Sequence, residues 1–217
     1  MKFIQTYENF SGETIHIFDL DDTLMNSPSF EELVLKLIKE DITVSDLLQR
    51  SLKSIGKQVS DLRHENGRIY INDPEEKITV KGDWVRKGKR VYMTSPNKFY
   101  YLDESLPTSL KDFADIYKKA SKKAIVTGRT EEMRDKILEV LEKFGLEEPN
   151  LGLYCYPNKT QTSDRVAEWK GKTIIRLIKG NGATKAYFYE DKSKWLKTAT
   201  KMVREKLPNV EFIPVKA

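Results

Sequence analysis

The sequence predicts an α/β fold, with a mainly parallel sheet covered by helices on both faces and a small α+β insertion after the first strand. From residue 107 onward, segments of helical periodicity alternate with short runs of β-branched and aromatic residues. This alternation is typical of βαβ units and of a parallel sheet. An earlier apolar run at 15–20 supplies the first strand, so residues 26–106 interrupt the sheet as an insertion.

The alternating region contains four helices and four strands. In the second helix the apolar residues Met133, Ile137, Leu141 and Phe144 share one face, and Gly145 suits its end. The predicted helices cover 107–120, 130–144, 163–179 and 193–206, and the predicted strands cover 123–128, 151–156, 185–190 and 210–215.

The insertion begins with helical patterns and continues with short β-forming runs. Residues 27–40 and 43–55 have apolar side chains at helical spacing. Four runs rich in β-formers follow, "RIYIND", "KITVKG", "KRVYMT" and "KFYYL", separated by turn signals. We predict a small antiparallel sheet there.

Composition excludes several protein classes. The chain has 217 residues, of which 33% are charged, and a mean hydropathy of −0.58, as expected of a soluble globular protein. No apolar run approaches the roughly 18 residues of a membrane helix, and no signal peptide is evident, so we expect a cytoplasmic protein without membrane contact. The lone Cys155 excludes an internal disulfide or thiolate metal site, and is expected to be a buried strand residue.

Polar residues gather where three predicted strands end. They are Asp19, Asp21 and Asp22 after the first strand, Thr127, Gly128 and Arg129 at the second, and Glu190 and Asp191 after strand 185–190. Ligands of open parallel sheets bind beyond the carboxyl ends of the strands. Converging carboxylates repel unless a cation lies among them, and oxygen ligands without histidine or cysteine favour Mg²⁺. The sequence therefore predicts a magnesium site.

The same residues resemble a known family. "FDLDDTL", "AIVTGR" and "AYFYED" are similar, in this order, to the first, second and fourth motifs of the haloacid dehalogenase-like (HAD) phosphatases. The resemblance covers residues 13–25 and 107–217. It implies a three-layer Rossmann-like catalytic core formed by 1–25 and 107–217, with 26–106 as an inserted cap domain.

The resemblance also implies roles for individual residues. Asp19 would be the nucleophile that forms an aspartyl-phosphate, and Asp21 the general acid and base. Thr127 would bind a phosphoryl oxygen, and Arg129 would either assist or serve as a capping or solvent-facing residue. Thr23 and Gly128 complete the substrate-binding set at these motifs. The implied Mg²⁺ ligands are Asp19, Asp21, Asp191 and Glu190, of which Asp191 is the first choice in the acidic pair.

The family's third motif is a lysine, and two candidates are present. Lys170 shares a helical face with the apolar Val166 and Ile174, whereas Lys172 aligns with Arg176 on the polar face. We therefore prefer Lys170 as the phosphate-neutralising residue. The "GKT" at this place is no P-loop, because that motif requires a glycine where Val166 stands.

Three other polar residues have structural interpretations. Asp22 occupies a position that the family pattern leaves free and is expected to cap a helix or lie in a loop. His16 alternates with Ile15 and Ile17, so we expect a packed core histidine. His64, in the polar "RHENGR", is expected to lie in a loop.

The insertion is the best guide to the substrate, because this family places a substrate-selecting cap there. Residues 77–98 contain seven Lys and Arg and one acidic residue, and the longer stretch to 102 interleaves them with Trp84, Tyr92, Phe99, Tyr100 and Tyr101. This mixture suits phosphate contacts and base stacking, with Lys87, Lys89 and Arg90 as substrate-binding residues. The alternative is an ordinary small sheet with aromatic side chains inward and solvated lysines.

Three functions are compatible with these patterns. The leading one is a Mg²⁺-dependent phosphomonoesterase acting on a nucleotide or a polynucleotide 3′-phosphate. It is favoured by a resemblance of "FDLDDTLMNSP", "VTGR", the Trp169–Lys170 pair and "YFYEDKSKW" to polynucleotide end-repair phosphatases and the Swiss Army Knife RNA-repair-like branch. The second is a small-metabolite phosphatase. The third is a catalytically silent module that binds nucleic acid or protein, which the intact Asp19 and Asp21 pair disfavours.

Overall fold

The computed structural model of the protein describes residues 13–39, 45–66, 68–94, 102–157 and 162–217. The chain divides into two compact units. The core unit comprises Met1–Asn26 and Ser109–Ala217, and the insertion unit comprises Ser27–Thr108.

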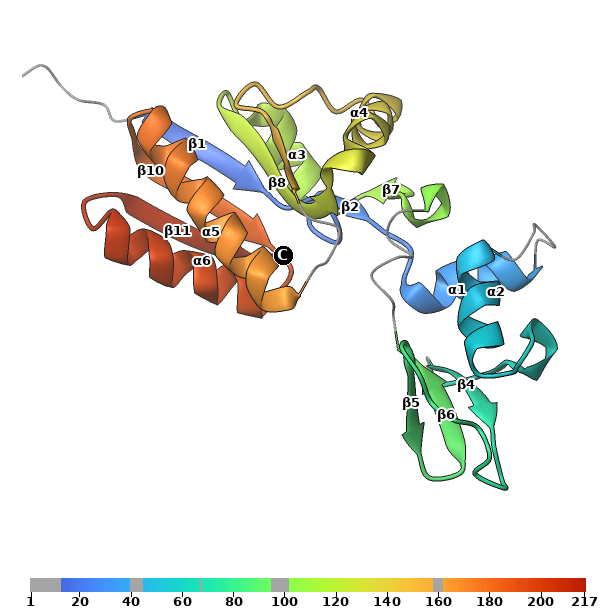
Figure 1. The fold of residues 1–217 in the computed structure, drawn as a ribbon. Coiled ribbons are helices and arrows are strands. Elements are labelled where there is room, and N and C mark those ends of the chain that lie inside the picture. Colours follow the sequence, from blue (N-terminus) through green and yellow to red (C-terminus); the bar gives the residue numbers. More distant parts are fainter. Residues whose placement is uncertain (1–12, 40–44, 67, 95–101, 158–161) are drawn as a thin grey trace, which may run out of the picture. The chain divides into compact units, whose positions relative to one another are not determined.

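The core unit is built on a five-stranded sheet in the order β11-β10-β1-β8-β9, in which every neighbouring pair is parallel. The strands are β1 (Glu13–Phe18), β8 (Lys123–Thr130), β9 (Leu153–Tyr156), β10 (Ala183–Glu190) and β11 (Glu211–Lys216). The first strand in sequence is the central strand of the sheet, as Figure 1 shows. The predicted α/β fold with a parallel sheet is confirmed.

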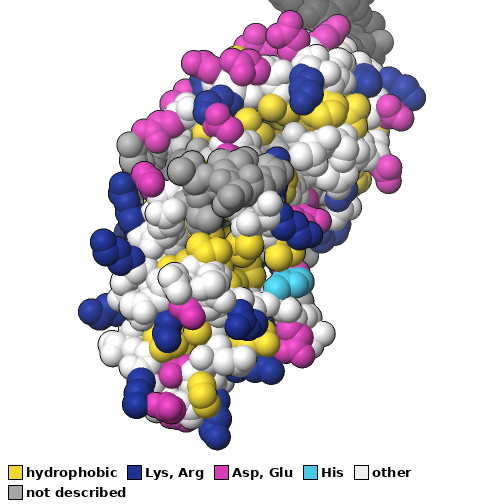
Figure 2. Space-filling view, turned by 90° about the vertical axis from the view of Figure 1, so that its right-hand side faces the viewer, with side chains coloured by type: hydrophobic (Ala, Val, Ile, Leu, Met, Phe, Trp, Pro, Cys, Tyr) yellow, Lys and Arg dark blue, Asp and Glu magenta, His cyan; other side chains and the backbone are white. Residues whose placement is uncertain are grey.

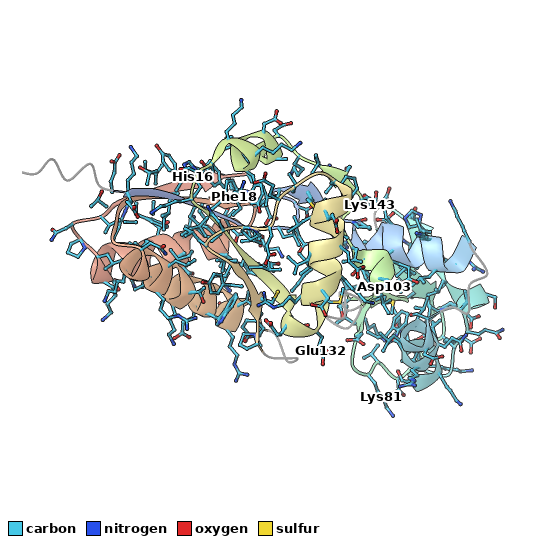
Figure 3. The ribbon with its side chains drawn as sticks, turned by 90° about the horizontal axis from the view of Figure 1, so that it is seen from above. His16, Phe18, Lys81, Asp103, Glu132 and Lys143 are labelled. Carbon is cyan, nitrogen blue, oxygen red and sulfur yellow. The ribbon has the colours of Figure 1, made fainter. Side chains whose placement is uncertain are left out.

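Helices lie on both faces of this sheet. α5 (Ser163–Gly180) and α6 (Ser193–Lys206) cover one face, where Ile15 and Ile17 of β1 are fully buried. α3 (Phe113–Lys119) lies on the other, where Tyr117 packs edge-on against Phe18 at a centroid distance of 5.3 Å. Figure 3 shows these helices on opposite sides of the strands. Alternate side chains of β1 therefore pack into two hydrophobic cores, one on each face of the sheet.

The remaining helix of the chain's second half is α4 (Arg134–Lys143), preceded by a 3₁₀ turn at Glu131–Met133. It buries Ile137 and Leu141 on the face that the sequence predicted.

The predicted helix 107–120 is wrong in its first half. Ser109–Leu110 instead form β7, which pairs antiparallel with β2 (Met25–Asn26), and the helix begins only at Phe113. The backbone of 109–110 thus finds hydrogen-bond partners far away in sequence, which a local helical pattern cannot reveal.

The insertion unit packs two helices against an antiparallel sheet. The helices are α1 (Phe30–Lys39) and α2 (Asp46–Ser54), followed by a 3₁₀ turn at Val59–Asp61. The sheet has the order β3-β4-β6-β5, from β3 (Arg63–Glu65), β4 (Arg68–Asn72), β5 (Trp84–Lys87) and β6 (Arg90–Met93). Another 3₁₀ turn in the described part of the insertion, Asp103–Ser105, precedes the return to the core unit. The predicted antiparallel insertion is confirmed.

Two predictions within the insertion are corrected. "KITVKG" forms no strand, because its backbone bonds to side chains: the amides of Lys77 and Ile78 donate to the Asp73 carboxylate, and the Ile78 carbonyl accepts from Arg86. His64 lies in strand β3 rather than in a loop. The run "KFYYL" lies, except for Leu102, outside the described residues.

Two single residues of the sheet, Cys155 and His16, pack against their neighbours. Cys155 is buried in β9, and burial raises the pKa of its thiol to about 12. His16 stacks on Tyr187 at a centroid distance of 4.8 Å and hydrogen-bonds the Tyr189 hydroxyl through Nδ1 at 3.0 Å, although it remains partly exposed. His16 and Phe18 lie along the same strand in Figure 3.

Within the described part of the chain, no helix combines the length and the apolar character needed to cross a bilayer.

Candidate active site

A tight turn follows the central strand and carries the acidic motif. The amides of Leu24 and Met25 both donate to the Leu20 carbonyl, at 3.0 and 3.1 Å. Asp22 adopts a left-handed conformation with φ of 57°, and its amide bonds the Met25 carbonyl. Aspartate tolerates this conformation better than most residues. Asp22 is thus a turn residue, and the turn fixes the direction of its neighbours Asp21 and Thr23.

Thr23 links this turn to the end of the neighbouring strand β10. Its side chain is fully buried, and its Oγ1 accepts a hydrogen bond of 3.1 Å from the Asp191 amide. A second bond in the same place joins the Asp19 amide to the Tyr189 carbonyl at 2.9 Å. The two acidic segments are therefore held side by side.

Three carboxylates converge at this edge. Asp19, Glu190 and Asp191 each offer an oxygen atom, and these atoms lie within 4.8 Å of one another. Asp19 and Glu190 are buried, at 2% and 0% exposure. Such a cluster of anions out of water requires compensating positive charge.

Lys170 of α5 supplies part of that charge. Its ammonium lies 2.8 Å from Asp19 Oδ1 and 2.7 Å from Glu190 Oε2, and its side chain is fully buried. Lys172, by contrast, is 64% exposed and pairs with Glu168 on the same helix. The helical periodicity distinguished the two lysines correctly with respect to burial.

Burial and mutual charge shift the protonation equilibria of this cluster. Burial raises the pKa of Asp19; the Lys170 ammonium opposes this rise and the Asp21 carboxylate adds to it. Burial and Asp19 raise the pKa of Glu190 to about 8, against the effect of Lys170. Burial lowers the pKa of Lys170, but the two carboxylates outweigh it, so the net shift is upward. Three carboxylates thus share the single ammonium of Lys170. One further cation would favour the ionised form of these carboxylates.

The oxygen atoms of the acidic pair are engaged differently. Glu190 uses Oε2 for Lys170 and Oε1 for the Lys192 amide at 3.0 Å. Asp191 Oδ1 is a buried oxygen with no hydrogen-bond partner among the described residues. A divalent cation with oxygen ligands fits this position, because it would satisfy Asp191 Oδ1 and share the Asp19 carboxylate.

Among the described residues, the carboxylate cluster consists of Asp19, Glu190 and Asp191, and Asp21 is not part of it. Its carboxylate is held by Arg129 from β8: Arg129 Nε lies 3.0 Å from both Asp21 oxygens, and an NH2 group lies 2.7 Å from Oδ1. The arginine side chain is 2% exposed and the aspartate 21%. A fork of this kind fixes both the position and the orientation of a carboxylate. Because its side chain is buried, the interpretation of Arg129 as a solvent-facing residue is wrong.

The segment Thr127–Arg129 passes close to the same edge. Thr127 is fully buried, and its Oγ1 accepts a hydrogen bond of 3.1 Å from the Arg129 amide. A Cβ atom on Gly128 would lie 3.1 Å from the Trp195 ring. Glycine therefore allows β8 to approach the indole, and the segment lies against α6.

Trp195 is a site residue that the sequence reasoning named only as part of a resemblance. Its ring lies 4.4 Å from the Lys170 ammonium and 4.1 Å from that of Lys192, and its indole nitrogen donates to Ser163 at 3.0 Å. Cations at such distances are attracted by the face of the ring. The indole thus covers the cationic side of the site. The sequence offered one signal for this role: Trp195 lies in the first turn of α6, directly after the segment that carries the acidic pair.

The other predicted substrate-binding residues belong to the insertion unit. Lys87 ends β5, Lys89 lies in the following turn and Arg90 begins β6. These three residues lie together at the turn of the β5–β6 hairpin.

Comparison of the chain with protein-family models, with curated proteins and with solved structures found no match.

Proposed function

We propose that the protein is a Mg²⁺-dependent phosphomonoesterase of the HAD type that works through an aspartyl-phosphate. The observation that carries the proposal is the buried Lys170, whose ammonium contacts both Asp19 and Glu190 at the carboxyl end of the central strand. A buried lysine between carboxylates beside an unsatisfied carboxylate oxygen suits a site that receives a dianionic phosphoryl group.

The proposed reaction has two displacement steps. In the first, an Asp19 carboxylate oxygen attacks phosphorus, the bond to the leaving oxygen breaks, and Asp21 donates the proton that this oxygen takes up. In the second, Asp21 removes a proton from water, and that water attacks phosphorus. Inorganic phosphate leaves and the Asp19 carboxylate is regenerated.

The residues around Asp19 favour this chemistry by position and charge. Lys170 orients the Asp19 carboxylate and offsets the charge of the incoming phosphoryl oxygens. Arg129 holds the Asp21 carboxylate through two donor groups. Thr127, whose Oγ1 accepts a hydrogen bond from the Arg129 amide, would donate its hydroxyl proton to a phosphoryl oxygen.

Asp19 and Asp191 are the residues that would hold Mg²⁺. Glu190 is less suited, because both of its oxygens already accept hydrogen bonds. When bound, the cation would neutralise charge on the phosphoryl group and on the carboxylates.

The proposed substrate is a nucleotide or a polynucleotide 3′-phosphate. The motif resemblance to end-repair phosphatases and the basic hairpin of the insertion support this choice. A small phosphorylated metabolite is the second candidate, and a silent binding module is the third.

The first experiment separates enzyme from module. Purified protein is incubated with p-nitrophenyl phosphate and Mg²⁺, alongside Asp19→Asn and the matched control Asp115→Asn, an exposed aspartate of α3. We expect turnover by the wild type and the control, and none by Asp19→Asn or in EDTA. Absence of turnover on every phosphomonoester offered would overturn the enzyme proposal.

The second experiment ranks the substrates. A 3′-phosphorylated oligonucleotide, mononucleotides and sugar phosphates are compared by kcat/KM with released phosphate as the readout. The highest value for the oligonucleotide or nucleotides supports the proposed substrate class. The highest value for a sugar phosphate favours the metabolite phosphatase.

A further inference from the structure

The four-stranded sheet of the insertion has two chemically different faces. The inner face packs on α1 and α2, and contributes Ile69, Ile71, Trp84, Val91 and Met93 to their common core. The indole nitrogen of Trp84 also points inward and donates to the Ser51 carbonyl at 3.1 Å. Trp84, a stacking candidate in the sequence, is therefore a core residue.

The outer face is defined by the strand register. Tyr70 of β4 lies opposite Arg63 of β3 and opposite Tyr92 of β6, and Tyr92 lies opposite Val85 of β5. Directly opposite residues in an antiparallel pair point to the same side, as do residues two apart in one strand. The same face therefore also carries Arg68, Lys87 and Arg90.

Two arginines of this face lie over its tyrosines. The Arg90 guanidinium carbon is 4.4 Å from the Tyr70 ring centroid, and that of Arg68 is 5.7 Å from the Tyr92 centroid. The two rings are themselves neighbours, with centroids 5.8 Å apart. Contact with the ring faces holds these arginines over the sheet, so binding an anion there requires less ordering of long side chains.

The charge of the outer face is strongly biased. Glu65 is the one acidic residue in the four strands; it pairs with Arg90 at 2.8 Å and accepts a hydrogen bond from the Tyr70 hydroxyl at 3.3 Å. Arg86 does not add to the face, because its guanidinium turns to Asp73 at 2.5 Å. Arg68 and Lys87 are exposed, and so is the apolar Val85, at 41%. Arg63 is also exposed, but one of its guanidinium nitrogens donates to the Ser60 and Leu62 carbonyls. Figure 2 shows Lys and Arg side chains, with Asp and Glu side chains among them, around the lowest part of the view, where the β5–β6 end lies in Figure 1.

We propose that this outer face binds single-stranded nucleic acid. Arginine and lysine suit the phosphates, and the partly exposed Tyr92 and Val85 beside them suit the unpaired bases. An acidic peptide would match the charge but offers no planar rings for the tyrosine, and a duplex keeps its bases stacked and unavailable. As an assignment of substrate class this inference rests on the proposed function, but the binding itself requires none of the catalytic residues.

The test measures binding without catalysis. Fluorescence anisotropy of a labelled single-stranded oligonucleotide of about 12 nucleotides, within the usual site sizes, is followed in EDTA. The probe carries no terminal phosphate. The same titrations are made at several salt concentrations, and with unlabelled single-stranded, double-stranded and polyglutamate competitors.

The variants are matched in charge and residue type. Arg68→Gln with Lys87→Gln alters the outer face, and Arg50→Gln with Lys53→Gln removes the same charges from α2, where Arg50 is 78% exposed. Tyr92→Leu removes the accessible ring. Circular dichroism and thermal unfolding establish that each variant is folded.

Saturable binding by the wild type is expected, with the single strand as the best competitor. The outer-face pair should weaken it about tenfold or more and reduce the salt slope by about 1.4, because each single-strand phosphate contact contributes about 0.7. Tyr92→Leu should weaken it about fivefold or more. The α2 pair should change affinity less than about twofold, since α2 packs on the inner face of the sheet and exposed charges that contact no phosphate are largely screened by salt.

Several results would overturn the inference. They are absence of saturable binding, equal weakening by the two charge pairs, and competition by polyglutamate or duplex as effective as that of the single strand. Turnover of p-nitrophenyl phosphate by the same preparations separates this failure from that of the proposed function. Turnover without oligonucleotide binding removes this inference alone, and binding without turnover removes the phosphatase alone.

Discussion

Lys170 Nζ lies 2.8 Å from Asp19 Oδ1, and neither side chain is more than 3% exposed. The pair joins the middle of α5 to the end of the central strand. Because both groups are out of water, the interaction affects stability as well as chemistry. Substitutions at this pair can therefore separate its effect on stability from its effect on catalysis.

Replacement of Lys170 by Met should impair both properties. The side chain retains its approximate size but leaves Asp19 and Glu190 without their common cation. Removing one partner of a buried ion pair costs about 3–5 kcal/mol in the free energy of unfolding, and loss of one charge-stabilising donor costs about 10²-fold or more in kcat. Urea unfolding and p-nitrophenyl phosphate turnover measure the two effects. Lys172→Met, on the exposed side of the same helix, is the control and should change neither.

Arg129 should act as a positioning residue for Asp21. Arg129→Lys keeps the charge but loses the fork that contacts both carboxylate oxygens. We expect kcat to fall about tenfold or more in Arg129→Lys and further in Arg129→Gln, with KM little changed, because the ground-state complex does not need an oriented Asp21. An increase of KM at constant kcat would instead indicate that Arg129 holds the substrate phosphate directly.

Gly171 should let α5 pack closely against Met202 of α6. A Cβ atom there would lie 2.6 Å from Met202 Sδ, so this side chain would have to shift. In the wild-type background the cost of that shift is expected to offset the gain in helix propensity, so Gly171→Ala should change the free energy of unfolding by less than about 1 kcal/mol. In a Met202→Ala background the same change should become stabilising, because alanine exceeds glycine in helix propensity by about 1 kcal/mol. Gly180→Ala, with no atom within 4 Å of its Cβ position, serves as control. The same effect of Gly171→Ala in both backgrounds would disprove the contact.

His16 should make the protein less stable in mild acid. Burial lowers the pKa of His16 below its usual value, so the unfolded chain binds the proton more readily. Stability is therefore greatest above the unfolded pKa and falls as the pH drops through the folded one. The facing groups are Tyr187, Tyr189 and the cross-strand neighbour Lys123.

The measurement is the free energy of unfolding as a function of pH, from neutral pH down into mild acid. It compares the wild type, His16→Phe and His64→Gln. His16→Phe keeps the stacked ring and should lose part of the acid sensitivity. His64→Gln removes the chain's other histidine and should retain the acid sensitivity that is due to His16. Identical pH profiles for the wild type and His16→Phe would show that His16 does not contribute.

Long periodic elements could be predicted from the sequence. Helices 163–179 and 193–206 appear as Ser163–Gly180 and Ser193–Lys206, because several turns of apolar periodicity define a helix whose face is buried. The same periodicity placed Lys170 inside and Lys172 outside. Elements stabilised by distant partners could not be predicted, such as β7, which exists through its pairing with Met25–Asn26.

The candidate site shows the same division. The acidic residues could be located because they follow recognisable strands. The fork between Arg129 and Asp21 joins residues 108 positions apart, and the Trp195 ring meets Lys170 across two helices. Neither contact leaves a local pattern in the sequence. In the insertion, the aromatic residues could be counted but not assigned to a face until the strand register was known, which turned Trp84 inward and Tyr92 outward.

The central claim is that Asp19 is the nucleophile. The most direct test is acid quenching of the protein during turnover of p-nitrophenyl phosphate with Mg²⁺, followed by peptide mass spectrometry. We expect one phosphoryl group, labile to hydroxylamine, on the peptide that contains Asp19, and neither a phosphoryl group nor turnover in Asp19→Asn. Turnover by Asp19→Asn at the wild-type rate, or a phosphoryl group on another residue, would contradict it.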